Sequence, residues 1–514
     1  MPFLTLSFHF TPAFDALPER VQNKLDLFSC IIMLFLSWFL WRLWRFTVLP
    51  QIYPDDPREL LYLVPSHFGN TNDPFALTLA GAKIYVITKP KDVADAYRNT
   101  ESLSFNEFVQ AVMRACGNTE ACIQAIYTPL PTDKAGFANP HGKSLATLAR
   151  QMHIHQLYPG KGLDFLERTF LEWFDVRMNM EKLQSGCSYA IKRNDGDVVL
   201  PLMEWCSDFL ISAGQRAYFG DELGQIDGAL AKEFVTFDEL SWQVLYQYPD
   251  LLVGKMKRSR NVIQRALKKY IQLPQSQRSG EAWFTKAMED EMRALNIGEE
   301  DIATMLMTIY WVLNTSTRKA AFWLLSYVLY TPSLIQVIRN ETKPAFNKAD
   351  GKLNLDYLHN QCPQLNAMWN ETIRMSASAA SVRFITADTV IGGKVLRRGN
   401  RLLIPFRQLH FDKSVFGETA DSFDHERFLE KKPSLTQSST WRPFGGGGTM
   451  CPGRHAAKRC VLLFVVLLLQ RFDIEMDGWQ SLPVADEGKP VLGIMSTRDN
   501  RDLRVRVTAR KTFA

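Results

Sequence analysis

The sequence predicts a mainly α-helical protein of the α+β class, with small β-sheets outside a helical core. Amphipathic or apolar periodic patterns dominate residues 140 to 345, among them NVIQRALKKYIQL and EEDIATMLMTIYWVLNTSTRKAAFWLLSYVLY. Strand-like segments flank this region: AGAKIYVIT precedes it, and residues 381 to 406 and the alternating DLRVRVTAR follow it. Because there is no internal repeat, we expect one large body with a helical centre.

The composition is that of a globular protein with a large core. Of the 514 residues, 46% are hydrophobic and 22% are charged. The 60 basic and 54 acidic residues are interspersed without a long basic block, so nucleic acid is not an expected partner. The eight cysteines form no CxxC pair, and we therefore expect them to be mostly reduced, in a reducing compartment.

An apolar segment near the N-terminus predicts a membrane anchor. Residues 27 to 41, LFSCIIMLFLSWFLW, carry no charge, and Arg42 and Arg45 follow them. If these arginines extend toward the interface, a helix at about 27 to 49 is long enough to cross a bilayer. The arginines predict that the C-terminal side is cytosolic. A cleaved signal peptide and a buried or interfacial helix are the alternative interpretations.

The expected domain organisation follows from this segment. Residues 1 to 50 form a tail and anchor, and residues 51 to 514 form the catalytic body. The stretch after Pro50, rich in Pro, Asp and Asn, is typical of a linker. We expect a single-pass protein of the endoplasmic reticulum with a cytosolic catalytic domain.

The stretch WRPFGGGGTMCPGRHAA, residues 441 to 457, places four glycines and Cys451 before a helix-prone run. A phosphate-binding loop is excluded because Arg454 and His455 stand where Lys and Ser or Thr are needed. A zinc site of Cys451, His455 and Cys460 lacks a fourth ligand and the usual paired cysteines. A thiolate bound to haem iron fits better, because glycines allow close approach and a helix N-terminus stabilises the thiolate.

This loop resembles a known family. Phe444, Gly447, Cys451 and Gly453 match the FxxGxxxCxG haem-binding signature of the cytochrome P450 superfamily. The resemblance implies the cytochrome P450 fold, haem b (iron protoporphyrin IX) with an axial cysteine thiolate, and Cys451 as the metal ligand. It also implies NADPH-cytochrome P450 reductase as the partner that delivers electrons.

Further landmarks of the family occur in the family's order. Glu371 and Arg374 form the only ExxR in the chain, 80 residues before Cys451, and HERF contributes Arg427. By resemblance, these three residues form a buried Glu-Arg-Arg network that braces the cysteine loop. LHFD (409 to 412) also matches a family segment, in which His410 is expected to be structural.

Binding of the haem propionates is expected to involve arginines. Arg383, in SVRFITAD, falls where the family commonly places a basic partner for a propionate. The family's WxxxR is absent near 140 to 160, and Thr449 replaces the usual Arg before the cysteine, so Arg442 is a further candidate. The alternative for both arginines is a solvated surface position.

The long helix over the haem departs from the family pattern. The family's AGx(D/E)T(T/S) turn aligns with residues 312 to 317, VLNTST. The acid is missing, and Ser316 stands where the alcohol usually is. We expect Ser316 to manage protons, with Asn314 or Thr315 sharing the task through waters. The alternative is that these polar side chains hydrogen-bond back to the preceding helical turn.

This substitution resembles a branch that contains sterol 7α-hydroxylases and prostacyclin synthase, and fungal secondary-metabolite enzymes are also similar. The resemblance implies a membrane-anchored monooxygenase that uses O2 and NADPH electrons to oxidise a lipophilic terpenoid, steroid or polyketide. Because the branch includes an isomerase, a haem-thiolate isomerase or dehydratase without need of O2 or reductase is the alternative. A haem-bound sensor or inactive relative is a third interpretation.

Substrate class is indicated only indirectly. The apolar residues between Met305 and Leu313 are expected to line the helix above the haem, although such a run also suits plain core. The stretch QVLYQYPDLLVGKM (243 to 256) resembles the membrane-dipping entry loop of the family. Both features favour a lipophilic substrate.

Overall fold

The computed structural model describes residues 19–43, 72–79, 82–132, 136–245, 248, 250–347, 351–429 and 435–510. The chain divides into two compact units, Met1–Thr71 and Asn72–Ala514, and each is described by itself.

In the first unit, helix α1 (Glu19–Leu43) contains the apolar segment that the sequence singles out. The helix begins eight residues before the expected start at 27, and the expected residues beyond Leu43 lie outside the described part. Large apolar side chains of this helix are exposed, for example Leu34 and Phe35. Among the described residues, no single helix has the length and apolar composition of a membrane span, and the apolar part of α1 covers Ser29–Arg42.

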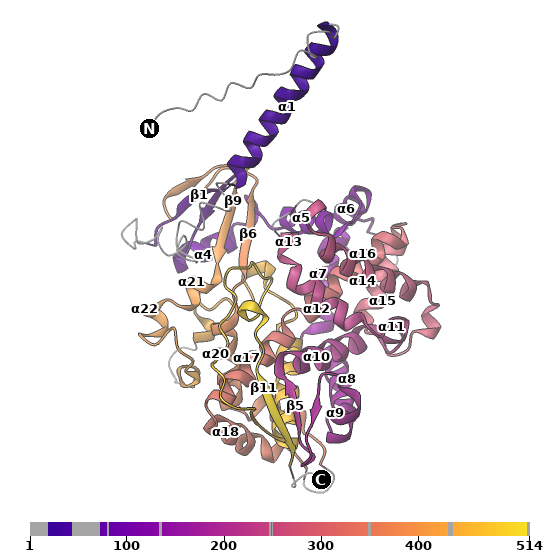
Figure 1. Cartoon of the computed structure of the whole chain (residues 1–514), viewed down its shortest axis with the longest axis vertical. Helices are drawn as coiled ribbons and strands as arrows, with labels where there is room; N and C mark the ends of the chain where they lie inside the picture. The colour runs from indigo at the N-terminus through magenta and orange to yellow at the C-terminus, as the bar shows by residue number, and fades with distance from the viewer. Residues whose placement is uncertain are drawn as a thin grey trace, which may run out of the picture. The chain divides into compact units, whose positions relative to one another are not determined.

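The second unit is mainly helical, as the sequence predicts (Figure 1). Its α-helices are α4 (Pro90–Arg98), α5 (Asn106–Cys116), α6 (Glu120–Tyr127), α7 (Leu145–Leu157), α8 (Lys161–Arg177), α9 (Met180–Gly186), α10 (Leu202–Phe219), α11 (Glu222–Ile226), α12 (Leu230–Leu240), α13 (Trp242–Leu245), α14 (Gly254–Gln272), α15 (Trp283–Ala294), α16 (Glu299–Asn314), α17 (Thr317–Tyr330), α18 (Ser333–Thr342), α19 (Leu355–Asn360), α20 (Pro363–Ser376), α21 (Phe406–His410), α22 (Lys413–Phe416) and α23 (Arg454–Arg471).

Small sheets lie at the two ends of this unit (Figure 1). The strands are β1 (Phe75–Leu79), β2 (Ala82–Val86), β3 (Leu103–Ser104), β4 (Ile191–Lys192), β5 (Val198–Pro201), β6 (Ala380–Ile385), β7 (Thr389–Ile391), β8 (Lys394–Leu396), β9 (Arg401–Pro405), β10 (Phe472–Met476) and β11 (Arg504–Ala509). One sheet has the order β1-β2-β9-β6-β3, the other has the order β10-β11-β5-β4, and β7 pairs with β8. Only β2 and β9 pair in parallel among the described strands.

The core is built around two helices that are apolar on nearly all sides. In α23, every side chain from Cys460 to Gln470 is buried, and in α17 every side chain from Arg318 to Leu329 is buried. A helix of this kind is stable only inside a protein or a membrane. Trp205 of α10 packs edge-on against Phe464 of α23, with ring centroids 6.3 Å apart. The apolar run that follows the cysteine loop therefore anchors that loop in the core.

The long apolar helix that the sequence predicts after residue 299 is interrupted. Helix α16 ends at Asn314 and α17 begins at Thr317, so Thr315 and Ser316 lie at the junction. Two aromatic side chains of α16, before the junction, pack against α12. Tyr310 and Trp311, which were expected to line the helix above the haem, pack instead against Phe234 and Phe237 of α12, with ring centroids 5.3 and 5.2 Å apart.

Close packing of α10 against this junction generates a testable prediction. A Cβ atom at Gly214 would lie 2.5 Å from Oδ1 of the buried Asn314. We therefore expect Gly214→Ala to lower the free energy of unfolding by about 1–3 kcal/mol, although alanine has the higher helix propensity. Urea unfolding measures this difference. In the control Gly254→Ala, at the start of α14, a Cβ meets nothing within 4 Å, and an equal loss there would contradict the prediction.

Candidate functional site

Three of the four glycines of the cysteine loop stand where a side chain would be strained or obstructed. Gly445 and Gly447 adopt φ angles of +75° and +56°, in the left-handed region that favours glycine. Cβ atoms at Gly446 and Gly447 would lie 3.1 and 3.2 Å from Tyr97 at the end of α4. A Cβ atom at Gly448, by contrast, would meet nothing within 4 Å. The loop thus needs bare backbone at its first three glycines, and much less at the fourth.

Cys451 lies at the end of this loop, just before α23. Its N–H donates a hydrogen bond to the carbonyl oxygen of Phe444 at 2.9 Å, and the residue is exposed. Desolvation by the surrounding protein raises the pKa of the thiol, and the N–H groups of Gly453 and Arg454 oppose this increase. The two N–H groups belong to the start of α23, where the helix dipole favours a negative charge. A metal cation that binds the sulfur would displace the thiol proton, and the start of α23 would help to stabilise the resulting thiolate.

The zinc interpretation receives no support from the geometry. Within the described ranges, no group of three or more His, Cys, Asp and Glu side chains is arranged to hold a metal ion. Cys460 is buried in the core, where desolvation raises the pKa of its thiol. Cys451 is thus a single candidate sulfur ligand, and it is exposed.

Glu371, Arg374 and Arg427 meet in one buried ion network. Arg374 donates bidentately to Glu371, with Nε to Oε2 and Nη2 to Oε1 both at 2.7 Å. Arg427 Nε donates to Glu371 Oε1 at 3.1 Å. The remaining arginine N–H groups reach backbone carbonyls: Arg374 Nη1 donates to Ala420 at 2.7 Å and to His410 at 2.9 Å. The network thereby fixes the chain between residues 410 and 427.

His410 connects this network to the cysteine loop. Its carbonyl accepts from Arg374, and its Nε2 accepts from the backbone N–H of Arg442 at 3.0 Å. Burial and the positive charges of Arg374 and Arg407 lower the pKa of His410 to about 3. The imidazole is therefore neutral, as an acceptor at Nε2 requires, and its role here is structural.

Unsatisfied donors gather on the other side of the glycine loop. Arg383 is 4% exposed, and its Nη2 donates to Thr449 Oγ1 at 2.5 Å, while its Nη1 has no hydrogen-bond partner. The hydroxyl of Tyr97 is also buried without a partner. The guanidinium carbons of Arg383 and Arg442 lie 5.5 and 5.7 Å from the centre of the Tyr97 ring. Buried donors of this kind are rare unless a ligand completes them, and a carboxylate would do so.

These observations test whether the chain can hold the haem that the resemblance implies. The exposed thiol with two supporting N–H groups suits iron ligation, and the donors of Arg383 and Tyr97 suit propionates. The residues present therefore fit the group. Thr449, which replaces the usual arginine, orients Arg383 through its hydroxyl. Sequence reasoning missed Tyr97, because nothing in the helical pattern of KPKDVADAYRN marks its tyrosine as a site residue.

The structure places the three candidate proton-handling residues, Asn314, Thr315 and Ser316, in different environments at the helix junction. Ser316 lines a pocket of about 280 Å³ together with Phe444 and Ala457, on the two sides of the cysteine. Thr315 instead donates to Asp238 Oδ1 at 2.5 Å, on the side of α12. Asn314 donates to the carbonyl of Tyr310 at 3.0 Å and packs toward α10. Of the three side chains, the one that shares a pocket with the cysteine loop is Ser316.

The glycine geometry predicts different effects at neighbouring positions. We expect Gly447→Ala to lower the free energy of unfolding by about 1–3 kcal/mol, because it combines a left-handed φ angle with a close contact to Tyr97. Gly448→Ala is the matched control, since a Cβ there is unobstructed. Urea midpoints of the two variants provide the measurement, and equal values would contradict this account of the loop.

The ion network predicts a large cost for a small change. Glu371→Gln leaves the buried Arg374 without its counterion, so we expect a loss of about 3–5 kcal/mol in the free energy of unfolding. Glu418→Gln is the control, because Glu418 pairs with Lys413 on the surface, where ion pairs contribute about 0–1 kcal/mol. A small loss in Glu371→Gln, measured by urea unfolding, would show that the network is dispensable.

Comparisons with known proteins agree with this geometry. Residues 139–504 match the family Cytochrome P450. The chain is 26% identical over 436 residues to Cytochrome P450 monooxygenase nodJ of Hypoxylon pulicicidum, covering 80% of this chain and 79% of that protein. It is 25% identical over 384 residues to the 5-beta-cholestane-3-alpha,7-alpha-diol 12-alpha-hydroxylase of Sus scrofa, covering 69% and 74%. Cytochrome P450 7A1 of Sus scrofa is 24% identical over 246 residues, covering 44% and 48%.

The family match covers more than half of the chain and includes the cysteine loop, the Glu371–Arg374 helix and the helix junction. The resemblance inferred from the sequence is thereby confirmed, and the haem that it implies is the family's cofactor. The chain therefore belongs to the cytochrome P450 family of haem monooxygenases and binds haem through an axial cysteine thiolate.

Proposed function

We propose that this protein is a membrane-anchored monooxygenase that oxidises a lipophilic secondary metabolite such as a terpenoid, steroid or polyketide. It uses O2 and takes two electrons from NADPH through NADPH-cytochrome P450 reductase. The observation that carries the proposal is the exposed thiol of Cys451 at the start of α23, beside buried arginine and tyrosine donors without partners.

In this proposal Cys451 is the axial ligand, and Phe444, Gly447 and Gly453 shape its loop. A thiolate-bound haem supplies O2 activation by favouring cleavage of the O–O bond. The N–H groups of Gly453 and Arg454 moderate the basicity of the sulfur. Arg383 and Arg442, together with Tyr97, would hold the haem propionates.

Ser316 is the proposed proton-handling residue. Ser316 lines the pocket beside Phe444, and its Oγ lies close to Gly493. In this position Oγ can hold and pass a proton. Thr315 and Asn314 are engaged with Asp238 and with the Tyr310 carbonyl, so their contribution is to position the junction. Val312, one turn before Ser316, is an apolar side chain that is 50% exposed.

A lipophilic substrate and a membrane location are supported by several exposed apolar groups. The apolar side chains of α1 support an N-terminal anchor in the endoplasmic reticulum, with the catalytic domain in the cytosol. In the described part of the expected entry loop, Leu251 and Leu252 are 93% and 65% exposed. The names of the relatives, a fungal monooxygenase and a hydroxylase of a cholestane diol, support the same class of reaction.

One observation favours a second candidate function. The position of the usual acid is occupied by Thr315, whose hydroxyl is directed to Asp238 and away from the Ser316 pocket. An enzyme that rearranges or dehydrates its substrate has less need of that proton supply than an oxygenase. A haem-thiolate isomerase or dehydratase that needs neither O2 nor reductase is therefore the alternative.

Spectroscopy and turnover separate these possibilities. We expect the reduced, CO-bound protein to show the red-shifted Soret band of a thiolate-ligated haem, and Cys451→Ser to lose it, because serine lacks the soft sulfur donor. Cys187→Ser, at a partly exposed cysteine outside the site, is the control and should keep the band. Loss of the band in both variants, or in neither, would contradict the assignment of Cys451.

Turnover of a lipophilic extract then tests the reaction. Product formed only with O2, NADPH and reductase supports the monooxygenase. Product formed under anaerobic conditions without reductase would overturn it in favour of the isomerase or dehydratase.

A further inference from the structure

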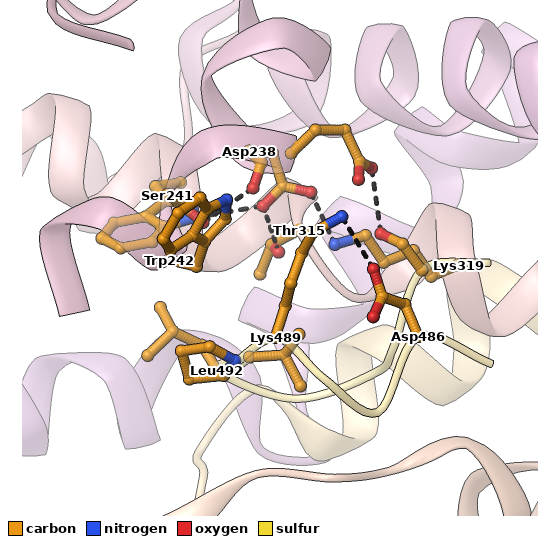
Figure 2. Close-up of a pocket in the computed structure, with 13 residues that line it drawn as sticks. Asp238, Ser241, Trp242, Thr315, Lys319, Asp486, Lys489 and Leu492 are labelled. Carbon is orange, nitrogen blue, oxygen red and sulfur yellow. Dashed lines mark hydrogen bonds and ion pairs between the residues drawn. The ribbon is translucent and has the colours of Figure 1, made fainter. Parts of the chain in front are cut away.

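A second pocket, on the far side of the helix junction from the cysteine loop, combines apolar walls with buried charges. It lies between the C-terminal end of α12, the α16–α17 junction and the segment 486–496, and its space measures about 370 Å³ with open solvent included (Figure 2). Its walls include Trp242, Trp311, Pro490, Val491 and Leu492, and its polar side chains are Asp238, Glu239, Ser241, Thr315, Lys319, Asp486, Lys489 and Ser496.

Asp238 is the centre of the charged group. Its Oδ1 accepts from Trp311 Nε1 at 3.2 Å and from Thr315 Oγ1 at 2.5 Å. Its Oδ2 accepts from Arg318 at 2.5 Å and pairs with Lys319 Nζ at 2.8 Å. Burial raises the pKa of Asp238, but Lys319 and Arg318 outweigh it and hold the pKa at about 2. Asp238 is therefore ionised, and both of its oxygens are fully engaged.

Lys319 retains hydrogen-bonding capacity that the protein does not use. Its side chain is 3% exposed, and Asp238 is its single ion-pair partner in the described part of the chain. An ammonium group has three N–H donors, so two remain for a group inside the pocket. Lys489 also lines the pocket and pairs with Asp486 at 2.7 Å. Spare donors beside apolar walls are suited to an acceptor oxygen on an apolar molecule.

The charges of the side chains around the pocket indicate whether that oxygen belongs to a neutral or to an anionic group. Three cations, Arg318, Lys319 and Lys489, face three carboxylates, Asp238, Glu239 and Asp486. Because the group is neutral overall, an anionic ligand would add an uncompensated buried charge. A carbonyl oxygen accepts hydrogen bonds without bringing a charge, and it is therefore the better match.

This pocket adjoins the proposed reaction site. Thr315 and Leu492 line it, while Ser316 and Ile494, one and two residues farther along the same segments, line the pocket beside Phe444. A molecule held by an oxygen at Lys319 thus lies next to the junction that separates the two pockets. In this pocket its apolar skeleton would meet Trp311 and Leu492.

We propose that this pocket binds the carbonyl group of an otherwise apolar substrate, with Lys319 as the hydrogen-bond donor and Trp242, Trp311 and Leu492 as the apolar wall. The proposal rests on the proposed function and specifies its substrate as a carbonyl-bearing lipid. Lys319 is a specificity residue in this account, because it selects the oxygen and takes no part in the chemistry.

Calorimetric titration of the haem-loaded protein, without reductant, tests the proposal. The probes are two matched pairs, 5α-androstan-17-one with 5α-androstane and 2-tetradecanone with tetradecane. We expect at least one ketone to bind about tenfold more tightly than its hydrocarbon, the size expected for a hydrogen bond to a charged donor. In Lys319→Met the ratio should fall to about one, and Lys319→Arg should restore part of it.

The surface variant Lys413→Met is the control and should keep the wild-type ratio. Equal affinities within every pair in the wild-type protein, or no binding of any probe, would overturn the proposal without recourse to a variant. An unchanged ratio in a folded Lys319→Met protein would do the same. Tighter binding of the matching alcohol, 5α-androstan-17β-ol, would assign the contact to an acceptor such as Glu239 instead.

These titrations need neither O2 nor reductase, so failure of the carbonyl site is distinguishable from failure of the monooxygenase. If the protein prefers ketones but forms no product, the carbonyl site is supported and the proposed function is overturned. If it oxidises lipids but binds ketone and hydrocarbon with equal affinity, the proposed function is supported and the carbonyl site is overturned.

Discussion

The site depends above all on the buried ion network of Glu371, Arg374 and Arg427. Glu371 and Arg374 are fully buried, and removing such charges from water is so costly that each must be paired and hydrogen-bonded. Glu371 accepts from both arginines and from the N–H of Asp424 at 2.9 Å. Because the arginines also donate to several backbone carbonyls, the network holds the mostly irregular segment between residues 410 and 427, whose helix α22 has only four residues.

The cysteine loop takes its position from this segment on one side and from the core on the other. Arg442 is tied to His410, whose carbonyl belongs to the network, and Arg454 begins α23, which is buried from Cys460 to Gln470. The loop between them needs left-handed glycines to pass close to Tyr97. The two ends of the loop are held in place, and its middle consists of glycines without side chains. The thiol is therefore exposed while its neighbours are fixed, and a metal ligand that binds a flat cofactor needs both the exposure and the fixed position.

Much of this could be predicted from the sequence because the signals are local. The cysteine loop, the ExxR helix and the apolar run of α23 each lie within a short stretch whose spacing reports the chemistry. Tyr97 and Asp238 could not be predicted in this way. Tyr97 meets Arg442 from 345 residues away, and Asp238 meets Thr315 across 77, so only the folded chain brings them together.

The helix junction shows the same limit of prediction from the sequence, here for residues that are adjacent in the chain. Asn314, Thr315 and Ser316 are adjacent polar residues, and the sequence offered all three as partners in proton transfer. On a helix, neighbouring residues point about 100° apart, so three in a row face three different environments. The structure directs them to α10, to α12 and to the pocket beside Phe444, respectively. The sequence therefore offered three candidates on one turn of helix, and the neighbours of that turn decide which of them lines the pocket beside Phe444.

The two buried charge clusters differ in a way that bears on their roles. In the Glu371 network the strong hydrogen bonds connect fixed protein groups, so the cluster defines a geometry. In the Asp238 cluster the carboxylate is equally saturated, yet Lys319 keeps donors that border a cavity. Buried donors without acceptors are costly, and an arrangement that retains them is stabilised when a ligand supplies the missing oxygen. The first cluster is therefore complete in the protein alone, whereas the second can donate further hydrogen bonds to a ligand in the pocket.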